Sequence, residues 1–206
     1  MKYIPYLVAM NYLAHIYLSG ENDMLKIGNF IADSVKGKQY LDYPESIQQG
    51  ITLHRNIDEF TDSHPIVHQS VHRLFDKYSH YSTVIVDILY DHFLAANWQD
   101  FHETSLEKYS QNFYDIIQSN PEVLPKRVKN FMPYMIKHNW LVTYSTIDGI
   151  GLILSQMDKR TKFRSKMGES VNELRKYYQE FKDEFYRFFA ELEAFAAQRK
   201  KELLEQ

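Results

Sequence analysis

The spacing of helix-breaking residues constrains the fold of this chain more than any other feature of its sequence. No glycine occurs between Gly50 and Gly149, and the prolines stand at positions 5, 44, 65, 121, 125 and 133. Long intervals without such residues favour helices. No alternating apolar pattern of useful length indicates a strand, and no internal repeat is found. The sequence therefore predicts an all-α fold, organised as a single helical domain over residues 1–206.

The expected helices follow from these breaks and from the apolar periodicity. Pro44 and Pro65 indicate helix starts, because proline is tolerated in a first turn, and the Asn120-Pro121 step indicates a break. We expect helices near residues 9–19, 22–36, 45–62, 66–79, 82–98, 104–119, 122–138, 139–157 and 170–204.

The long C-terminal helix has the clearest pattern of all. Its apolar residues recur at alternating steps of three and four, which is a heptad pattern. They are Val171, Leu174, Tyr178, Phe181, Phe185, Phe188, Leu192 and Phe195. We expect this face to pack on its own domain, and a homodimer formed through the same helix is the alternative.

Composition restricts the chemistry that the chain can support. It has no cysteine, so disulfides, thiolate zinc sites and cysteine nucleophiles are excluded, and a metal must be bound by His, Asp or Glu. A net charge of −3 gives no overall basic field for nucleic acid. No run of 18 apolar residues is present, and His15 interrupts the apolar N-terminal segment. We therefore expect no membrane span, a buried first helix and a cytoplasmic location.

The expected third helix carries a first group of candidate ligands. Ile47, Ile51, His54 and Asp58 follow at steps of four, three and four, so they share one helical face. Because the first two are apolar, this face should point inward, where a buried aspartate is costly unless it is paired or binds a metal. The i, i+4 spacing lets His54 and Asp58 reach one ion, and Asp62 lies one turn further along. A solvent-facing His–Asp hydrogen bond is the alternative.

The expected helix 82–98 carries a second group. Asp87 and Asp91 are four residues apart beside the apolar stripe, and His92 falls within it. Neighbouring carboxylates repel each other unless a cation or a shared proton relieves them. An N-cap or surface salt bridge is the alternative for Asp91, but its position in mid-helix argues against that.

Together, the two groups offer a mixed carboxylate and imidazole ligand set formed by His54, Asp58, Asp91 and His92. Such a set suits Mn²⁺, Mg²⁺, Fe²⁺ or Zn²⁺. An ion of this kind can polarise a phosphoryl oxygen and lower the pKa of a bound water, as phosphodiester hydrolysis requires.

Other histidines and acids are weaker candidates. His15 on the first helix is a further candidate ligand, with a hydrogen-bonded core histidine as the alternative. Asp33 lies away from the apolar face of its expected helix, so periodicity does not select it. Four more histidines recur about every four residues, among polar residues that favour an exposed face. These are His64, His68, His72 and His80.

Four sequence runs are shared with a known family. They are MNYLAH from Met10, GNFIADSVKG from Gly28, GITLHRNIDEFTDSHP from Gly50 and VDILYDHFLAANW from Val86. In these runs the chain resembles the acyl carrier protein phosphodiesterase family, also called acyl carrier protein hydrolase. The second half matches more loosely, through NWLVTY from Asn139 and the long final helix.

The resemblance implies an HD-domain-like helical bundle, distantly related to the HD-domain metallohydrolases. It implies hydrolysis of the phosphodiester that links 4′-phosphopantetheine to a serine of holo acyl carrier protein, which gives the apo form, with a divalent cation that is usually Mn²⁺. Asp33 becomes an essential acidic residue by this resemblance. The candidate catalytic residues are then Asp33, Asp62 and His15, and the metal positions are His54, Asp58, Asp91 and His92.

Acyl carrier proteins are strongly acidic helical bundles, so the resemblance also implies a basic docking patch. Arg55 flanks the expected site, and Arg160, Arg164 and Lys166 belong to a run of five cations within residues 159–166. A solvated loop is the alternative for that run. Two rival functions stay open: hydrolysis of nucleotides or other small phosphodiesters, and a non-catalytic binding module that uses the final helix.

Overall fold

The computed structural model describes residues 11–205, and this range contains helices and no strand, which confirms the all-α prediction. The α-helices are α1 (Tyr12–Leu18), α2 (Asp23–Ile31), α3 (Glu45–Ser63), α4 (Pro65–Tyr78), α5 (Tyr81–Ala96), α6 (Leu106–Ser119), α7 (Lys126–Lys137), α8 (Trp140–Thr143), α9 (Ile147–Arg160), α10 (Val171–Lys176) and α11 (Tyr178–Leu204). Short 3-10 helices lie between them: η1 (Ala32–Ser34), η2 (Gly37–Asp42), η3 (Trp98–Asp100), η4 (Pro121–Val123) and η5 (Met167–Glu169).

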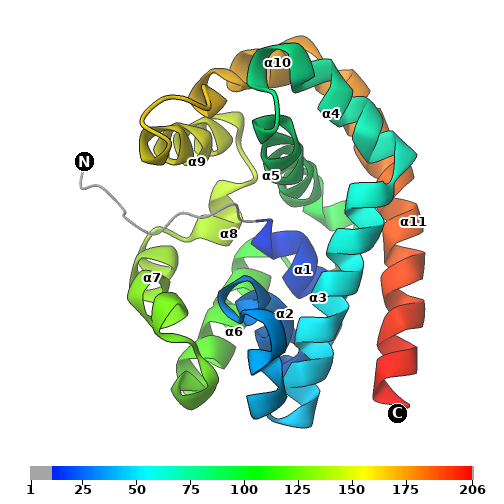
Figure 1. The fold of residues 1–206 in the computed structure, drawn as a ribbon, viewed down its shortest axis with the longest axis vertical. Helices are drawn as coiled ribbons and strands as arrows, with labels where there is room; N and C mark the ends of the chain where they lie inside the picture. The colour runs from blue at the N-terminus through cyan, green and yellow to red at the C-terminus, as the bar shows by residue number, and fades with distance from the viewer. Residues whose placement is uncertain (1–10, 206) are drawn as a thin grey trace.

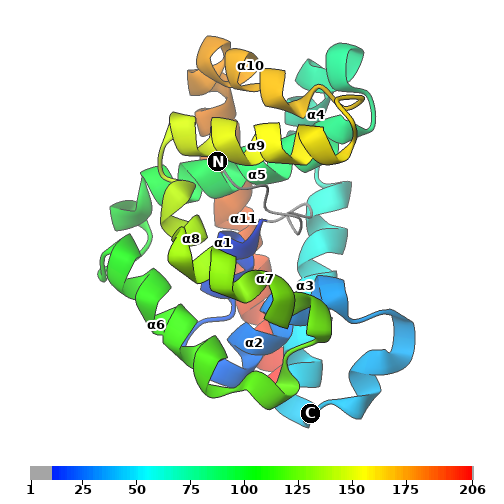
Figure 2. The ribbon, with the colours of Figure 1, turned by 90° about the vertical axis from the view of Figure 1, so that its left-hand side faces the viewer.

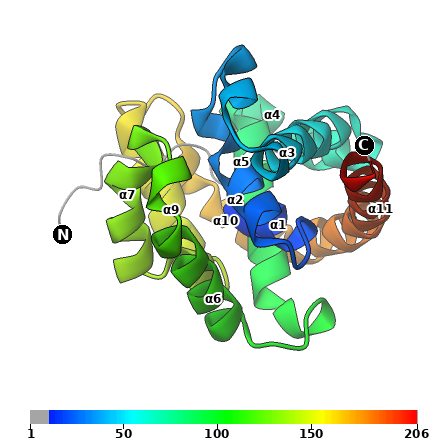
Figure 3. The same cartoon turned by 90° about the horizontal axis from the view of Figure 1, so that it is seen from below.

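The helices form two groups on either side of a central set, as the view from below shows (Figure 3). On one side α3 and α11 run next to each other along the edge of the molecule (Figure 1). On the other side α6, α7, α8 and α9 cover one face (Figure 2). Between them α1 packs against α2, α5 and α11. Short, buried α1 therefore lies where side chains from several long helices can reach it.

Two glycines allow α2 and α3 to cross closely. A Cβ atom on Gly28 would collide with the carbonyl oxygen of Ile47, and one on Gly50 would collide with that of Leu25. Because neither glycine carries a side chain, the two backbones meet directly at this point. This crossing brings the end of α2 and the 3-10 turn η1 against the middle of α3, where the candidate ligands of α3 lie.

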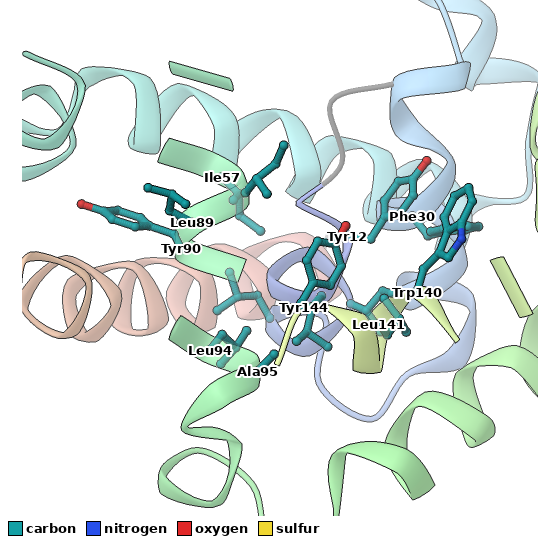
Figure 4. Packing of buried hydrophobic residues seen from close by; sticks show 14 of the residues in the cluster. Tyr12, Phe30, Ile57, Leu89, Tyr90, Leu94, Ala95, Trp140, Leu141 and Tyr144 are labelled. Atoms are coloured by element: carbon teal, nitrogen blue, oxygen red, sulfur yellow. The ribbon is translucent and has the colours of Figure 1, made fainter. Parts of the chain in front are cut away.

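Buried apolar side chains from nearly all the helices form a continuous core. Figure 4 shows Ile57 and Leu89, from α3 and α5, on one side of this core, and Phe30 and Trp140 on the other, with Tyr12 between them. The Tyr12 ring lies 4.8 Å from that of Phe30, centroid to centroid. Within residues 11–205 no helix is both long enough and apolar enough to cross a membrane.

The heptad face of the C-terminal helix lies inside the molecule, as expected. Phe181, Phe185, Phe188 and Leu192 are buried, and α11 contacts α1, α3, α4 and α5. This packing of the long helix on its own chain accounts for its apolar pattern.

Several expected boundaries are wrong. The expected helix 22–36 ends at Ile31 and continues as the 3-10 turn η1, and the expected helix 139–157 divides into α8 and α9. The C-terminal helix is interrupted at Tyr177, whose φ and ψ of −116° and 31° leave the α region. The first helix was expected from residue 9, but residues 9 and 10 lie outside the described range.

Of the four histidines expected on an exposed face, three are exposed in the structure. His68, His72 and His80 are exposed, whereas His64 is buried. His64 begins α4 as its N-cap, and its Nδ1 accepts a hydrogen bond from the backbone amide of Ile66 at 3.3 Å. This capping role explains why His64 is buried while the other three histidines are exposed.

Candidate metal centre

Four candidate side chains meet where α1, η1 and α3 come together. His15 comes from the last turn of α1, Asp33 from η1, and His54 and Asp58 from successive turns of α3. The α3 pair continues the face that starts with Ile47 and Ile51, and both isoleucines are fully buried. The periodicity of the third helix therefore gave the correct face.

The distances within this group are short. His54 Nε2 lies 3.2 Å from Asp58 Oδ2 and 3.4 Å from Asp33 Oδ1. His15 Nε2 lies 3.3 Å from Asp58 Oδ1, and the two imidazole rings stack with their centroids 4.0 Å apart. One nitrogen or oxygen atom from each of His15, His54 and Asp58 lies within 4.8 Å of the other two. Three side chains from two helices thus present donor atoms to one small volume.

A buried asparagine fixes the orientation of His54. The Asn29 amide nitrogen donates to the carbonyl of His15 at 2.9 Å and to Ser19 Oγ at 3.0 Å. The amide oxygen of Asn29 therefore faces His54 Nδ1, at 3.0 Å. An acceptor at that position favours a proton on Nδ1, and this leaves Nε2 free to bind a metal on the side of the carboxylates.

The group is closed on its imidazole side and open on its carboxylate side. The side chains of His15 and His54 are 1% and 6% exposed, whereas those of Asp33 and Asp58 are 41% and 45% exposed. The buried imidazoles are therefore held rigidly, while the carboxylates can be approached from solvent.

The charges of the group depend strongly on one another. Burial lowers the pKa of His54, but its contacts with Asp33 and Asp58 outweigh burial and raise that pKa to about 9. Burial and the neighbouring His54 lower the pKa of His15. Burial raises the pKa values of Asp33 and Asp58, yet the histidines more than offset this and hold both below their ordinary value. Both carboxylates are therefore anionic at neutral pH.

Asp91 lies close by, but its carboxylate holds the start of α1. Oδ2 accepts a hydrogen bond from the backbone amide of Leu13 at 3.0 Å, and Oδ1 accepts one from that of Ala14 at 2.9 Å. These amides belong to the first turn of α1, so Asp91 caps a helix that is distant from it in sequence. Burial raises the pKa of Asp91 to about 7, against the lowering effect of the two amides.

His92 has partners of a different kind. Its Nδ1 lies 2.8 Å from the carbonyl oxygen of Tyr144, and its Nε2 lies 3.3 Å from the hydroxyl of Tyr178. The three donor groups that share one volume are His15, His54 and Asp58, so the structure groups His15 with the α3 pair and gives Asp91 and His92 other contacts.

The remaining candidates lie around the edge of the group. Asp62 is exposed one turn beyond Asp58, and burial together with the charge of Asp58 raises its pKa. Arg55 donates to the carbonyl of Gly37 at 2.9 Å and lies over the ring of Tyr40. Three basic candidates are exposed at the end of α9 and in the loop that follows it. These are Arg160, Arg164 and Lys166.

Sequence reasoning missed two residues of this region. Periodicity does not select Asn29, because a single amide on an otherwise apolar helix face carries no sign of a function. Asp87 stands four residues before Asp91 in the sequence, but it is not among the predicted site residues. In the structure burial raises the pKa of Asp87 well above its ordinary value, and the charges of four aspartates, Asp58 foremost, raise it further. Asp87 also lines the same small pocket as His15 and Asp91.

The residues present fit a divalent cation. His15 Nε2 is near Asp58 but not in hydrogen-bonding geometry, so within the described chain both buried nitrogens of His15 lack a hydrogen bond. A buried polar group without a partner is costly, and a metal ion on Nε2 would satisfy one of these nitrogens. Two imidazoles and carboxylates form a mixed donor set that suits Mn²⁺, Fe²⁺ or Zn²⁺.

Comparison with known proteins identifies the family of the chain. The family model described as acyl carrier protein phosphodiesterase matches residues 10–192. The acyl carrier protein phosphodiesterase of Photorhabdus laumondii is 30% identical to this chain over 181 residues, which are 87% of this chain and 91% of that protein. The protein of the same name from Pectobacterium atrosepticum is 31% identical over 181 residues, with 87% and 94% covered.

The match spans every element that builds the centre, from α1 through η1, α3 and α5 to most of α11. No solved structure matches the chain. Because the family model covers nearly all of the sequence and the similar proteins match over most of their own length, the chain belongs to the acyl carrier protein phosphodiesterase family.

Proposed function

We propose that this protein is a metal-dependent phosphodiester hydrolase that releases 4′-phosphopantetheine from holo acyl carrier protein and leaves the apo form. Its place is then in fatty acid metabolism, and we propose a cytoplasmic location. The observation that carries the proposal is the convergence of His15, His54 and Asp58 within 4.8 Å. The names of the similar proteins supply the substrate class.

In this proposal the metal is held by His15, His54 and Asp58, with Asp33 beside them. Mn²⁺ is the proposed ion, and Mg²⁺, Fe²⁺ or Zn²⁺ are the competitors. A bound divalent ion supplies Lewis acidity toward a phosphoryl oxygen and lowers the pKa of a water molecule. Asn29 orients the imidazole of His54 through its Nδ1, as the partners of metal-binding histidines commonly do.

Asp33 is the proposed general base. Its contact with His54 keeps its pKa low, so it is anionic at neutral pH and can accept a proton from an attacking water. Its side chain is 41% exposed, so a substrate and a water can reach it. Asp62, one turn beyond Asp58 on the exposed side, is a second acid near the same opening.

The openness of the centre suits a protein substrate. The susceptible bond of holo acyl carrier protein joins the prosthetic group to a serine on the protein surface. Asp33 and Asp58 are both about two-fifths exposed, so a folded partner can bring a surface phosphodiester to them without first unfolding.

The direct test is incubation of the protein with holo acyl carrier protein and Mn²⁺, followed by mass spectrometry of the carrier. We expect loss of the prosthetic group, no loss in the presence of a chelator, and recovery when Mn²⁺ is restored. Turnover of nucleotides with an intact carrier would instead favour a small-diester hydrolase.

A matched pair of variants connects the activity to the centre. We expect Asp58→Ala to abolish turnover, because it removes a ligand, while the circular dichroism spectrum remains helical. The control is Glu59→Ala, since Glu59 is the exposed neighbour of Asp58 on the same helix. Full activity in Asp58→Ala would contradict the proposed ligand set.

A further inference from the structure

The end of α9 and the segment that follows it form a strongly basic surface. We call residues 159–166 the basic loop. Five of its eight residues are cations and none is acidic, and all five cations are exposed; they are Lys159, Arg160, Lys162, Arg164 and Lys166. Among them stands Phe163, which is 63% exposed, more than any other large apolar side chain in residues 11–205. The loop thus combines positive charge with an exposed aromatic ring.

The backbone of this loop is held in an unusual shape. Lys162, Phe163 and Lys166 have φ values of 56°, 60° and 54°, in the left-handed region. Each such residue costs roughly 1–2 kcal/mol when it has a side chain. Conformations of this kind persist only where the surrounding structure determines them, and they gather at functional surfaces.

A buried aspartate, Asp158, helps to hold the loop in this conformation. Asp158 is 7% exposed, and its Oδ1 accepts a hydrogen bond from Ser165 Oγ at 2.8 Å. Its carbonyl oxygen accepts one from the amide of Phe163 at 2.9 Å. Ser165 is itself buried, and its amide donates to Thr161 Oγ1 at 3.1 Å. These bonds pull the middle of the loop inward and leave the cations and Phe163 outside.

Charges of the basic loop and of the candidate metal centre act on one shared residue. Tyr12, at the start of α1, connects them: burial raises the pKa of its hydroxyl, the charge of Asp33 raises it further, and the charges of Arg127 and Arg160 lower it. Asp33 of the candidate centre and Arg160 of the basic loop therefore act on one hydroxyl group. In Figure 1, α9 and the loop after it lie at the outer edge of the molecule, with α7 below them.

We propose that the basic loop is a pre-shaped docking surface for the acidic helical face of acyl carrier protein, with Phe163 as its apolar anchor. This inference rests on the proposed function for the identity of the partner. Charge complementarity supports the choice, because opposite potentials steer association and an anchored aromatic side chain adds contact area. A loop already held in its binding shape loses less entropy on association. Asp158 is then a positioning residue, which acts through the shape of the loop.

The test measures binding separately from hydrolysis. The dissociation constant of labelled holo acyl carrier protein is measured for the full-length chain and for Lys162→Glu/Arg164→Glu. We expect this double variant to bind at least tenfold more weakly at low salt, and we expect the difference to shrink as salt increases. The KM for a small substrate, bis(p-nitrophenyl) phosphate, should stay the same, because that diester does not need the loop.

The matched control reverses two exposed lysines elsewhere, Lys108 on α6 and Lys201 on α11. Lys108→Glu/Lys201→Glu changes the net charge by the same amount and should bind the carrier nearly as well as the unchanged chain. Equal weakening in both double variants, or none in either, would overturn the docking proposal. Tight, loop-dependent binding without any hydrolysis would instead refute the proposed function and leave the docking surface standing.

Two further variants test the proposed roles of Phe163 and Asp158 separately. Phe163→Ser removes an exposed ring, so we expect weaker carrier binding with an unchanged melting temperature. Asp158→Ala removes the acceptor of the Ser165 hydroxyl, so it should make the loop more open to trypsin at its cations and should weaken carrier binding, without changing turnover of the small diester. Unaltered carrier binding in Phe163→Ser would exclude the ring as an anchor. Unaltered trypsin cleavage in Asp158→Ala would exclude the Asp158 side chain as the support.

Discussion

At the scale of single residues, the orientation of one imidazole decides whether the centre can hold a metal. Asn29 is buried, and both ends of its amide are used: the nitrogen by His15 and Ser19, and the oxygen by His54. Since the nitrogen end is occupied by two acceptors, the amide cannot turn over without losing them. His54 Nε2 is therefore kept toward the carboxylates.

This arrangement predicts a specific effect of Asn29→Ala on metal binding. We expect the Mn²⁺ affinity, measured by isothermal titration calorimetry, to fall about 10–100-fold, the usual effect of losing the partner of a metal-binding histidine. Ser19→Ala is the control, because it removes one of the two acceptors of the Asn29 amide nitrogen and leaves the bond to His54 in place. Equal Mn²⁺ affinity in Asn29→Ala and the unchanged protein would show that Asn29 does not orient the ligand.

At the scale of the helices, Asp91 shows why the position of α1 depends on a distant residue. α1 has only seven residues and gains little stability from its own hydrogen bonds. The Asp91 carboxylate satisfies two of its first-turn amides and fixes α1 against α5. We expect Asp91→Ala to lower the free energy of unfolding by about 1–3 kcal/mol for each amide left unsatisfied, as measured by urea denaturation.

The same carboxylate predicts a pH dependence. The pKa of Asp91 is about 7 in the folded protein and 3.8 ordinarily, so between these values the folded state holds more protons than the unfolded state. Stability from this group is therefore lost as the pH rises from about 4 to 7. With a chelator present, the stability of the unchanged protein relative to Asp91→Asn should decrease across that interval. A constant difference between the two proteins would contradict this.

A buried ion pair connects α4 to α11. Glu184 is buried, and its carboxylate accepts two hydrogen bonds from Arg73, at 2.5 and 2.6 Å, and one from Ser70. We expect Glu184→Ala to lower the free energy of unfolding by about 3–5 kcal/mol, because Arg73 keeps a partly buried, unpaired charge. The exposed neighbour Asp183 is the control, and Asp183→Ala should have little effect. A small effect of Glu184→Ala would show that water replaces the carboxylate.

The elements also show what the sequence could and could not predict. The i, i+4 spacing of His54 and Asp58 on an apolar face was enough to find half of the centre. Asp33 escaped the helical wheel because α2 ends at Ile31 and the following 3-10 turn redirects the chain. Asp91 looked unsuited to a cap because it lies in mid-helix, yet it caps another helix, a contact that local spacing cannot reveal.

At the scale of the whole molecule, the centre exists only when distant parts of the chain are folded together. His15 comes from α1 and the other two proposed ligands from α3, and these helices are placed by α2, α5 and α11. The unfolded chain therefore has no such site. A metal that binds only the folded state stabilises it by mass action.

We therefore expect Mn²⁺ to raise the melting temperature of the chelator-treated protein. At a free concentration of 100 times the dissociation constant, the gain is about 2.7 kcal/mol. Asp58→Ala should lose this gain, and Glu59→Ala should keep it. An equal Mn²⁺ effect on the melting temperatures of both variants would point to binding elsewhere.

The position of the metal tests the central claim most directly. Anomalous diffraction from a crystal grown with Mn²⁺ locates the ion without any assumption about activity. We predict that the strongest peak lies between His15 Nε2, His54 Nε2 and the carboxylate of Asp58. A strongest peak beside Asp91 and His92, or none at the predicted place with saturating Mn²⁺, would contradict the claim.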